Sequence, residues 1–241
     1  MTWWLDRPIA HRGLHGGDAI PENSLPAFAA CKARALPAEL DVTLLRDGSV
    51  AVFHDDSLER MTAGRGPIAD LDARGLRKLK LRGSDHAVPL LPEVLGLIDG
   101  AVGLLIEIKN KGAAGRAEEA ILGVLEGYGG PFAIQSFNPR SLMWFKDNAP
   151  HVARGQLSGD LRDGDSALYK RLLFRHFSLT RKGDPAFIGC DVRCLPARRV
   201  TRLRQKGTPV LGWTVRNQAE LRLAKHHCDN IIFEGFLPDW P

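Results

Sequence analysis

Two carboxylates stand close together in an otherwise apolar run of the sequence, Ala38-Glu39-Leu40-Asp41-Val42. Side chains alternate between the two faces of a β-strand, so Glu39 and Asp41 would point to the same face and the apolar residues to the other. Two neighbouring carboxylates that lose their hydration repel each other. A folded protein tolerates such a pair when a hard cation or a proton lies between them. The pair therefore predicts a site for metal or acid–base chemistry.

A histidine ends the next apolar run, Val50-Ala51-Val52-Phe53-His54-Asp55, which follows after the turn sequence Arg46-Asp47-Gly48-Ser49. A crossover to a parallel neighbour needs a dozen or more residues, so this short connection predicts an antiparallel hairpin. Imidazole titrates near neutral pH, and a histidine beside two carboxylates is suited to acid–base catalysis.

Other polar residues follow or end two further predicted strands. His11 and Arg12 come after the first strand, and Glu107 and Lys109 repeat the spacing of two in a later one. Barrel enzymes place their chemistry at the carboxyl ends of the strands, so three carboxylates, two imidazoles and two cations are expected to meet at one mouth. Oxygen ligands favour Mg²⁺ or Ca²⁺ over zinc, and the cations suit a phosphate.

Each of these residues has a simpler explanation when it is taken alone. Glu107 and Lys109 could be an ion pair inside a barrel, and His11 could be a hydrogen-bonded core histidine. Glu39 and Asp41 are harder to explain in this way, because two buried acids need a neutralising partner. The complete set favours an active site.

Short apolar runs alternate with helix-compatible segments along the chain. The expected strands, apart from the one that ends at His54, are Pro8–His11, Ala38–Leu44, Gly103–Lys109, Phe132–Ser136, Val152–Leu157, Phe187–Val192, Val210–Val215 and Asn230–Phe233. The expected helices are Ser24–Arg34, Pro92–Ile98, Arg116–Tyr128, Pro139–Asn148, Ser166–His176, Pro196–Lys206 and Gln218–His226. Eight strands alternating with helices predict an α/β fold, a (β/α)₈ TIM barrel with an extra β-hairpin strand after the second barrel strand.

Residues 56–91 form the longest connection before a convincing helix, and they are expected to be an elaborated loop on the catalytic face. This connection carries an amphipathic stretch near 71–81. No linker-like or low-complexity segment interrupts the sequence. A single domain over residues 1–241 is therefore predicted.

The composition is ordinary for a globular protein, with 44% hydrophobic and 25% charged residues and a net charge of +5. Lys and Arg are scattered rather than interleaved with aromatic residues, so nucleic-acid binding is not expected. No apolar stretch approaches the roughly 20 residues that span a bilayer, and no secretory signal opens the sequence. The four cysteines lack zinc-site spacing and are expected to be mainly buried thiols in a cytoplasmic protein.

The motifs above resemble those of the glycerophosphodiester phosphodiesterase family. The matching stretches in the first half are Ala10–Gly13, Pro21–Ser24, Glu39–Val42, Val52–Arg60, Pro89–Leu95 and Ile106–Lys109. Weaker matches in the second half are Gln135–Phe137 and Gly212–Val215. Two positions depart from the family pattern. Ser24 stands where threonine is commoner, and Phe233-Glu234-Gly235-Phe236 replaces the usual Thr-Asp pair.

The resemblance implies an enzyme that hydrolyses small glycerophosphodiesters to sn-glycerol 3-phosphate and an alcohol. By the family pattern, one divalent cation, Mg²⁺ or Ca²⁺, would be held by Glu39, Asp41 and Glu107. The acid–base pair would be His11 and His54, and the phosphate contacts would be Arg12 and Lys109. The residues expected to support the site are Glu22, Asn23, Asp55 and Trp213.

Two other functions remain open from the sequence. A lysophospholipase D of the same fold would need an apolar landing surface, for which the candidates are Trp3, Trp4, Phe236, Leu237 and Trp240. Packing of the terminal segments against the barrel explains these aromatic residues more simply. A non-catalytic barrel that binds a phosphorylated ligand is less favoured, because every histidine and carboxylate expected of an enzyme is present.

Overall fold

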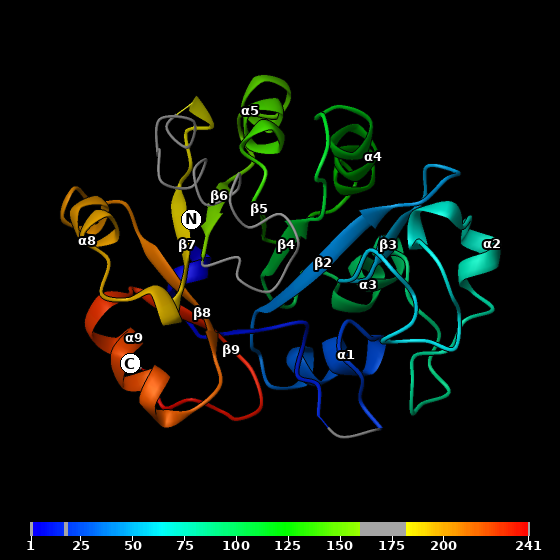
Figure 1. Cartoon of the computed structure of the whole chain (residues 1–241), viewed down its shortest axis with the longest axis horizontal. Helices are drawn as coiled ribbons and strands as arrows, with labels where there is room; N and C mark the ends of the chain where they lie inside the picture. Colours follow the sequence, from blue (N-terminus) through cyan, green and yellow to red (C-terminus); the bar gives the residue numbers. More distant parts are fainter. Residues whose placement is uncertain (1, 17–18, 160–181, 241) are drawn as a thin grey trace.

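A closed barrel of eight parallel strands forms the centre of the computed structural model, which describes residues 2–16, 19–159 and 182–240 (Figure 1). The ring closes because β1 pairs with β9 on one side and with β2 on the other. The barrel strands are β1 (Ile9–Ala10), β2 (Ala38–Leu44), β4 (Leu104–Ile108), β5 (Phe132–Ser136), β6 (Arg154–Ser158), β7 (Phe187–Asp191), β8 (Val210–Val215) and β9 (Asn230–Phe233). The predicted TIM barrel is confirmed.

The extra strand β3 (Val50–Val52) lies outside the ring and pairs antiparallel with β2. Val42 faces Val52 and Leu44 faces Val50 across this hairpin. The turn reverses at Gly48, whose φ of 90° is a backbone conformation that costs glycine little and other residues more. The hairpin places Phe53 beside Asp41 of β2, because the Phe53 amide donates to the Asp41 carbonyl at 2.9 Å.

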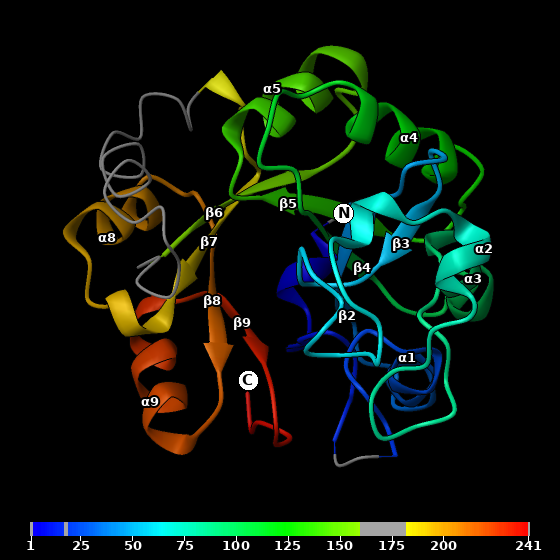
Figure 2. The same ribbon diagram turned by 45° about the vertical axis from the view of Figure 1, so that its right-hand side comes forward.

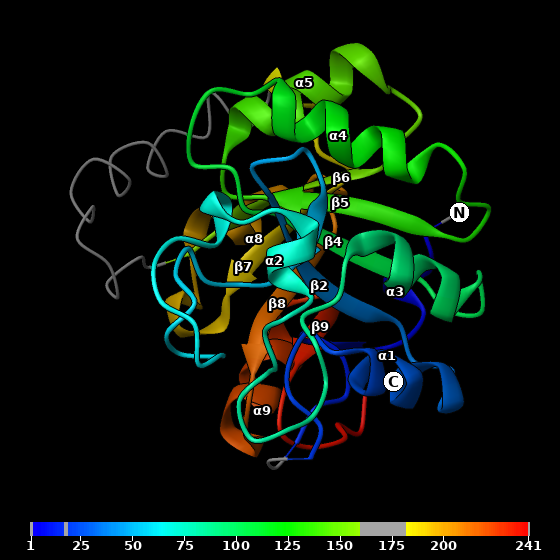
Figure 3. The same cartoon turned by 90° about the vertical axis from the view of Figure 1, so that its right-hand side faces the viewer.

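The helices follow the predicted ranges closely. They are α1 (Leu25–Ala33), α3 (Leu91–Ile98), α4 (Arg116–Leu125), α5 (Pro139–Asn148), α8 (Arg198–Gln205) and α9 (Gln218–His227). Ser24 caps α1 by accepting a hydrogen bond from the backbone of Ala27, and Asn138 caps α5 in the same way. Figure 3 shows α4 and α5 side by side on the outside of the barrel.

Two helix ends differ from the prediction, and one predicted helix is not tested. The helix expected from Pro196 begins at Arg198, because Leu195 is extended and Ala197 is the N-cap. A 3₁₀ turn, η3 (Val192–Cys194), precedes it. Helix α4 ends at Leu125, three residues early, where glycines at 127, 129 and 130 disfavour further helix. The helix predicted over Ser166–His176 lies outside the described residues.

The excursion between β3 and α3, residues 56–90, packs around an apolar cluster of its own. It contains η2 (Ile68–Asp70) and the short helix α2 (Ala73–Leu76), so only part of the amphipathic stretch is helical. Figure 2 shows α2 beside β3. The buried members of the cluster are Leu45, Ala51, Phe53, Leu58, Ile68, Leu76, Leu81 and Val88. The excursion is therefore anchored to the hairpin by burial of apolar side chains.

The tryptophans near the start of the chain close the amino-terminal end of the barrel. Trp4 is buried against Phe187 at the start of β7, with ring centroids 5.5 Å apart. The ring of Trp3 lies over Gly103, where a Cβ atom would come within 2.2 Å of it. Both rings belong to a cluster with the first inward-facing residues of several strands. For this pair, packing against the barrel is confirmed.

The terminal residues after β9 also pack against the core. Phe236 and Trp240 are partly buried against it. Among the described residues, Leu237 is the one large hydrophobic side chain that is mainly exposed, at 54%. In the parts of the chain that the structure describes, no helix has both the length and the hydrophobicity that crossing a bilayer requires.

Candidate active site

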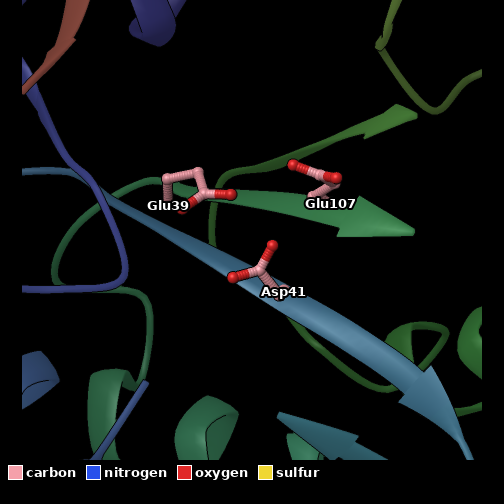
Figure 4. Close-up of side chains that lie close together, drawn as sticks. All are labelled: Glu39, Asp41 and Glu107. Carbon is pink, nitrogen blue, oxygen red and sulfur yellow. The ribbon is translucent and has the colours of Figure 1, made fainter. Parts of the chain in front are cut away.

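Three buried carboxylates meet at the carboxyl-terminal end of neighbouring barrel strands. Glu39 and Asp41 come from β2 and Glu107 from β4, and Asp41 lies directly opposite Glu107 in the parallel register. One oxygen from each carboxylate lies within 4.8 Å of the others. Figure 4 shows the three side chains turned toward one another from the two strands. The predicted convergence of these carboxylates is present.

Two cations are paired with this triad. Lys109 Nζ lies 2.7 Å from Glu107 Oε1 and 3.2 Å from Asp41 Oδ1, and Arg12 Nε lies 3.2 Å from Asp41 Oδ2. The ion pair between Glu107 and Lys109 thus exists, but two positive charges leave one of three carboxylates uncompensated. Asp41 Oδ1 is buried and accepts no hydrogen bond from any residue that the structure describes. An all-oxygen site with excess negative charge fits a hard divalent cation.

Burial and the neighbouring charges shift the pKa values of Glu39 and Asp41 in opposite directions. Burial raises the pKa of Glu39 well above its ordinary value, and the charges of Asp41 and Glu107 raise it further. Burial also acts to raise the pKa of Asp41, but Lys109 and Arg12 outweigh it and hold that pKa well below its usual range. Binding of a divalent cation and protonation of Glu39 would therefore compete.

Glu39→Gln is expected to stabilise the metal-free protein at alkaline pH. Because the folded-state pKa of Glu39 is raised above the ordinary 4.5, its contribution to stability is present below that value and is lost as pH rises through the folded pKa. Thermal unfolding in EDTA from about pH 5 to about pH 9 should show a variant whose Tm increasingly exceeds that of the wild type. Added Ca²⁺ should raise the Tm of the wild type more than that of the variant. A Tm difference that does not depend on pH would contradict the assignment.

Each of the two predicted catalytic histidines is bonded through Nδ1 to a carboxylate. His54 Nδ1 lies 2.7 Å from Asp55 Oδ1, and His11 Nδ1 lies 2.8 Å from Glu234 Oε2. His11 Nε2 lies 4.0 Å from Glu39 Oε2, at the edge of the triad. The Nε2 atom of each ring is therefore left for chemistry in the cavity.

Glu234 was not among the residues predicted to support the site. It directly follows β9, and β9 pairs with β1 so that Ala10 faces Phe233, which brings the next residues, His11 and Glu234, together. Arg216 Nη2 donates a hydrogen bond of 3.0 Å to Glu234 Oε2, the same oxygen that bonds His11. Closure of the barrel could have identified this contact from the sequence, because the residues that follow the first and last strands of a closed barrel become neighbours.

The His11–Glu234 pair has a defined charge state. Burial lowers the pKa of His11 to about 4, even though the hydrogen bond that His11 donates to Glu234 acts to raise it. The hydrogen bond with His11 lowers the pKa of Glu234 to about 2, against the opposing effect of burial. At neutral pH His11 is therefore neutral and Glu234 is ionised. A neutral ring that donates from Nδ1 can accept a proton at Nε2.

Glu234→Gln is expected to lower kcat while changing KM little, because the amide keeps a hydrogen-bonding partner for His11 but loses the charge that stabilises the protonated ring. The loss should be about 10-fold or more, and Glu234→Ala should lose more because the ring is no longer oriented. Steady-state kinetics on a soluble glycerophosphodiester measure both. Equal activity of all three proteins would show that Glu234 has no part in orienting His11.

The loop after β1 holds its residues in an unusual backbone conformation. Arg12 and Asn23 have φ values of 55° and 53°, in the left-handed region that side chains other than glycine seldom adopt. In this conformation the Arg12 amide donates to Glu39 Oε2 at 3.0 Å, and Asn23 Nδ2 donates to Asp41 Oδ2 at 2.8 Å. Gly13 lies so close to α1 that a Cβ atom there would be 2.8 Å from Ala27 Cβ. The strained loop therefore holds the carboxylates of Glu39 and Asp41 in place through hydrogen bonds.

A cavity of about 400 Å³ lies over the triad. The predicted site residues that line it are His11, Arg12, Glu39, His54, Glu107, Lys109 and Trp213. Asp41 and the predicted supporting residues Glu22, Asn23 and Asp55 lie behind these, bonded to them rather than exposed in the cavity. Sequence reasoning missed the polar residues of the opposite wall, Asp191, Arg193 and Arg216.

Trp213 forms part of that opposite wall. Its ring meets Phe137 edge-on, with centroids 5.5 Å apart and an interplanar angle of 88°. Gly159 leaves room for the ring, because a Cβ atom there would come within 2.9 Å of Trp213 Cζ2. An aromatic surface thus faces the charged triad across the cavity, so a ligand that binds the triad would contact the ring with its remaining part.

Comparison with known proteins agrees with this geometry. Residues 11–235 match the Glycerophosphoryl diester phosphodiesterase family. The Bacillus subtilis (strain 168) protein YhdW is 29% identical over 248 residues, covering 97% of this chain and 94% of its own. A glycerophosphodiester phosphodiesterase of Bacillus altitudinis is 32% identical over 65% of this chain and 68% of its own.

A solved structure extends the agreement to the fold. It is an Oleispira antarctica phosphodiesterase in complex with the product sn-glycerol-3-phosphate, 28% identical, with a TM-score of 0.79 over 95% of this chain and 93% of its own. The sequence match spans most of the barrel, and the structural match spans nearly all of it. The chain therefore belongs to the glycerophosphoryl diester phosphodiesterase family and is an enzyme of that class.

Proposed function

We propose that the enzyme hydrolyses small glycerophosphodiesters to sn-glycerol 3-phosphate and an alcohol, using one divalent cation and the pair His11 and His54. The observation that carries the proposal is that three buried carboxylates with excess negative charge and two histidines, each bonded at Nδ1, surround one cavity. The family and the product bound to the Oleispira antarctica relative support the same substrate class.

Glu39, Asp41 and Glu107 would hold the cation, and their carboxylate oxygens suit Mg²⁺ or Ca²⁺. When bound, such an ion acts as a Lewis acid that offsets negative charge on phosphate oxygens. The side chains of Arg12 and Lys109 line the same part of the cavity. Their N–H groups would donate charge-assisted hydrogen bonds to the phosphate.

The two histidines have different surroundings, which suggest different roles. His11 is buried and neutral, so it would accept the proton of the nucleophile, either water or a hydroxyl of the substrate. His54 is one-third exposed and is backed by the ionised Asp55, so it would be the acid that protonates the departing alkoxide. The carboxylates at Nδ1 fix both rings with Nε2 toward the substrate.

The test is release of sn-glycerol 3-phosphate from glycerophosphocholine and glycerophosphoethanolamine, measured after EDTA treatment and again after addition of Mg²⁺ or Ca²⁺. Activity on the soluble diesters that disappears with EDTA and returns with a cation supports the proposal. Faster turnover of lysophosphatidylcholine would favour the lysophospholipase D alternative. Binding without turnover of any diester would favour a non-catalytic barrel.

We further propose that residues 1–241 form one domain in a cytoplasmic protein. All described strands belong to one sheet, and Cys31, Cys190 and Cys228 are buried thiols outside any disulfide. Burial raises the pKa of each of these thiols to about 12, which keeps them protonated and unreactive. A single unfolding transition and recovery of the protein in the cytoplasmic fraction are the expected observations.

A further inference from the structure

Arg60 connects two parts of the site that lie on different loops. Its Nε and Nη2 atoms lie 2.6 and 3.1 Å from the two carboxylate oxygens of Asp55, which in turn bonds His54. Its Nη1 and Nη2 atoms lie 3.0 and 2.7 Å from the two oxygens of Glu22. Glu22 then accepts a hydrogen bond from Arg12 Nη1 at 2.8 Å. The Arg60 guanidinium thus joins Asp55, which bonds His54, to Glu22, which bonds Arg12.

The geometry uses a property that only arginine has. A planar guanidinium offers five N–H donors in a fixed fork, so it can bind two carboxylates along two edges at once. Lysine is a point charge without this fork. Single ion pairs at the surface contribute little to stability. The side chains of Asp55 and Glu22, however, are only 20% and 14% exposed, and removal of Arg60 would take a charged partner from both at once.

The excursion outside the barrel holds Arg60 in place. Arg82 donates to the backbone carbonyls of Glu59, Arg60 and Thr62 at 2.7, 3.0 and 3.1 Å. Leu58, two residues before Arg60, is buried in the apolar cluster of the excursion. Arg60 itself does not line the cavity. The excursion therefore presents Arg60 to the residues behind the site rather than to a ligand.

We propose that Arg60 is a positioning residue that fixes the ring of His54 and the guanidinium of Arg12 relative to each other. This inference rests on the proposed function, in which His54 transfers a proton and Arg12 binds phosphate. Arg60 acts through two carboxylates, so loss of Arg60 disturbs both partners in one step. A misplacement of about 1 Å at a reacting group can cost about 100-fold in rate.

Arg60→Ala is expected to lower kcat/KM for glycerophosphocholine by about 100-fold, with kcat falling through His54 and KM rising through Arg12. Arg60→Lys should be intermediate, because an ammonium group satisfies one carboxylate. The matched control is Arg65→Ala, which removes an exposed arginine of the same excursion and should change kcat/KM less than about twofold.

Added guanidinium distinguishes positioning from a general loss of structure. The Arg60 side chain is 47% exposed, so its place in Arg60→Ala is open to solvent. Millimolar guanidinium chloride should restore at least about tenfold of the lost kcat/KM, whereas sodium chloride at equal ionic strength should not. If Arg60→Ala unfolds, Arg60→Gln replaces it in the same measurements. Activity of either variant within about threefold of wild type, or a loss that guanidinium does not restore, overturns the proposal.

A double-mutant comparison tests the connection itself. Asp55→Asn and Glu22→Gln should be non-additive in the wild-type background and additive in Arg60→Ala, because Arg60 is the described residue that bonds both carboxylates. Additive effects in both backgrounds overturn the proposal.

Wild-type protein that releases no sn-glycerol 3-phosphate would count against the proposed function alone. The tautomer of His54, followed by ¹⁵N NMR, would then test Arg60, with loss of the Nδ1–H form in Arg60→Ala as the expected result and no change as the contrary one.

Discussion

Asp41→Asn is expected to abolish the response of the enzyme to divalent cations and to lower kcat by about 10³-fold, because charge stabilisation by a metal is worth several kcal/mol. Asp41 is the most enclosed carboxylate of the triad and contacts both Lys109 and Arg12. Its replacement removes a negative charge from the triad and leaves those two cations without their shared carboxylate. Cation titration of EDTA-treated protein, followed by sn-glycerol 3-phosphate release, measures the effect.

A control for burial accompanies this variant. Glu118 is also fully buried and bonded, to Ser141, Asn110 and the backbone of Gly115, but it lies outside the cavity. Glu118→Gln should therefore reduce thermal stability and leave the cation response intact. If Asp41→Asn kept the cation response of the wild type, Asp41 would not be a metal ligand.

His11→Ala and His54→Ala are expected to respond differently to the leaving group. Each should lower turnover of glycerophosphocholine by about 10²–10⁴-fold, as loss of general acid–base catalysis does. A glycerophosphodiester of p-nitrophenol has a leaving group that departs without protonation. His54→Ala should recover most of its activity on that substrate, because the acid is no longer needed, whereas His11→Ala should remain impaired.

Circular dichroism and the Tm of both variants show whether the fold survives. The opposite result, with His11→Ala rescued and His54→Ala impaired, would exchange the two roles. Full activity of both variants on glycerophosphocholine would end the assignment of acid–base catalysis to these histidines. The glycerophosphodiester of p-nitrophenol separates these outcomes, because only the step that needs an acid is bypassed.

The sequence predicts the carboxylate triad well because local patterns determine it. Alternation along β2 puts Glu39 and Asp41 on one face, and the same alternation applies to Glu107 in β4 and Lys109 directly after it. The short turn before β3 permits only a hairpin, so the position of His54 near β2 also follows from local sequence. Correct strand assignments and the parallel order of neighbouring strands are therefore enough to predict that these residues come together.

Contacts between distant parts of the chain could not be predicted in this way. Glu234 and His11 are 223 residues apart, and their contact depends on closure of the barrel between β1 and β9. Arg60 reaches Glu22 from an excursion whose path is set by its own apolar cluster. The start of α8 was misplaced because proline permits a helix start without requiring one at that position.

Most of the residues proposed as an apolar landing surface for a lipid-cleaving enzyme are not exposed in the structure. Trp3 and Trp4 fill the amino-terminal end of the barrel, at the opposite end from the triad. Of the terminal candidates, Leu237 is 54% exposed, while Phe236 and Trp240 pack against the core. Among the described residues, the terminal segments therefore offer little exposed apolar surface.

Diffraction from crystals grown with Mn²⁺, recorded at its absorption edge, shows whether the carboxylate triad holds the cation on which hydrolysis depends. One anomalous peak is expected within about 2.0–2.6 Å of an oxygen from each of Glu39, Asp41 and Glu107. No peak should appear there in crystals of Asp41→Asn. An ion bound elsewhere in the wild type, together with an undiminished rate of diester hydrolysis after removal of all cations, would contradict this role of the triad.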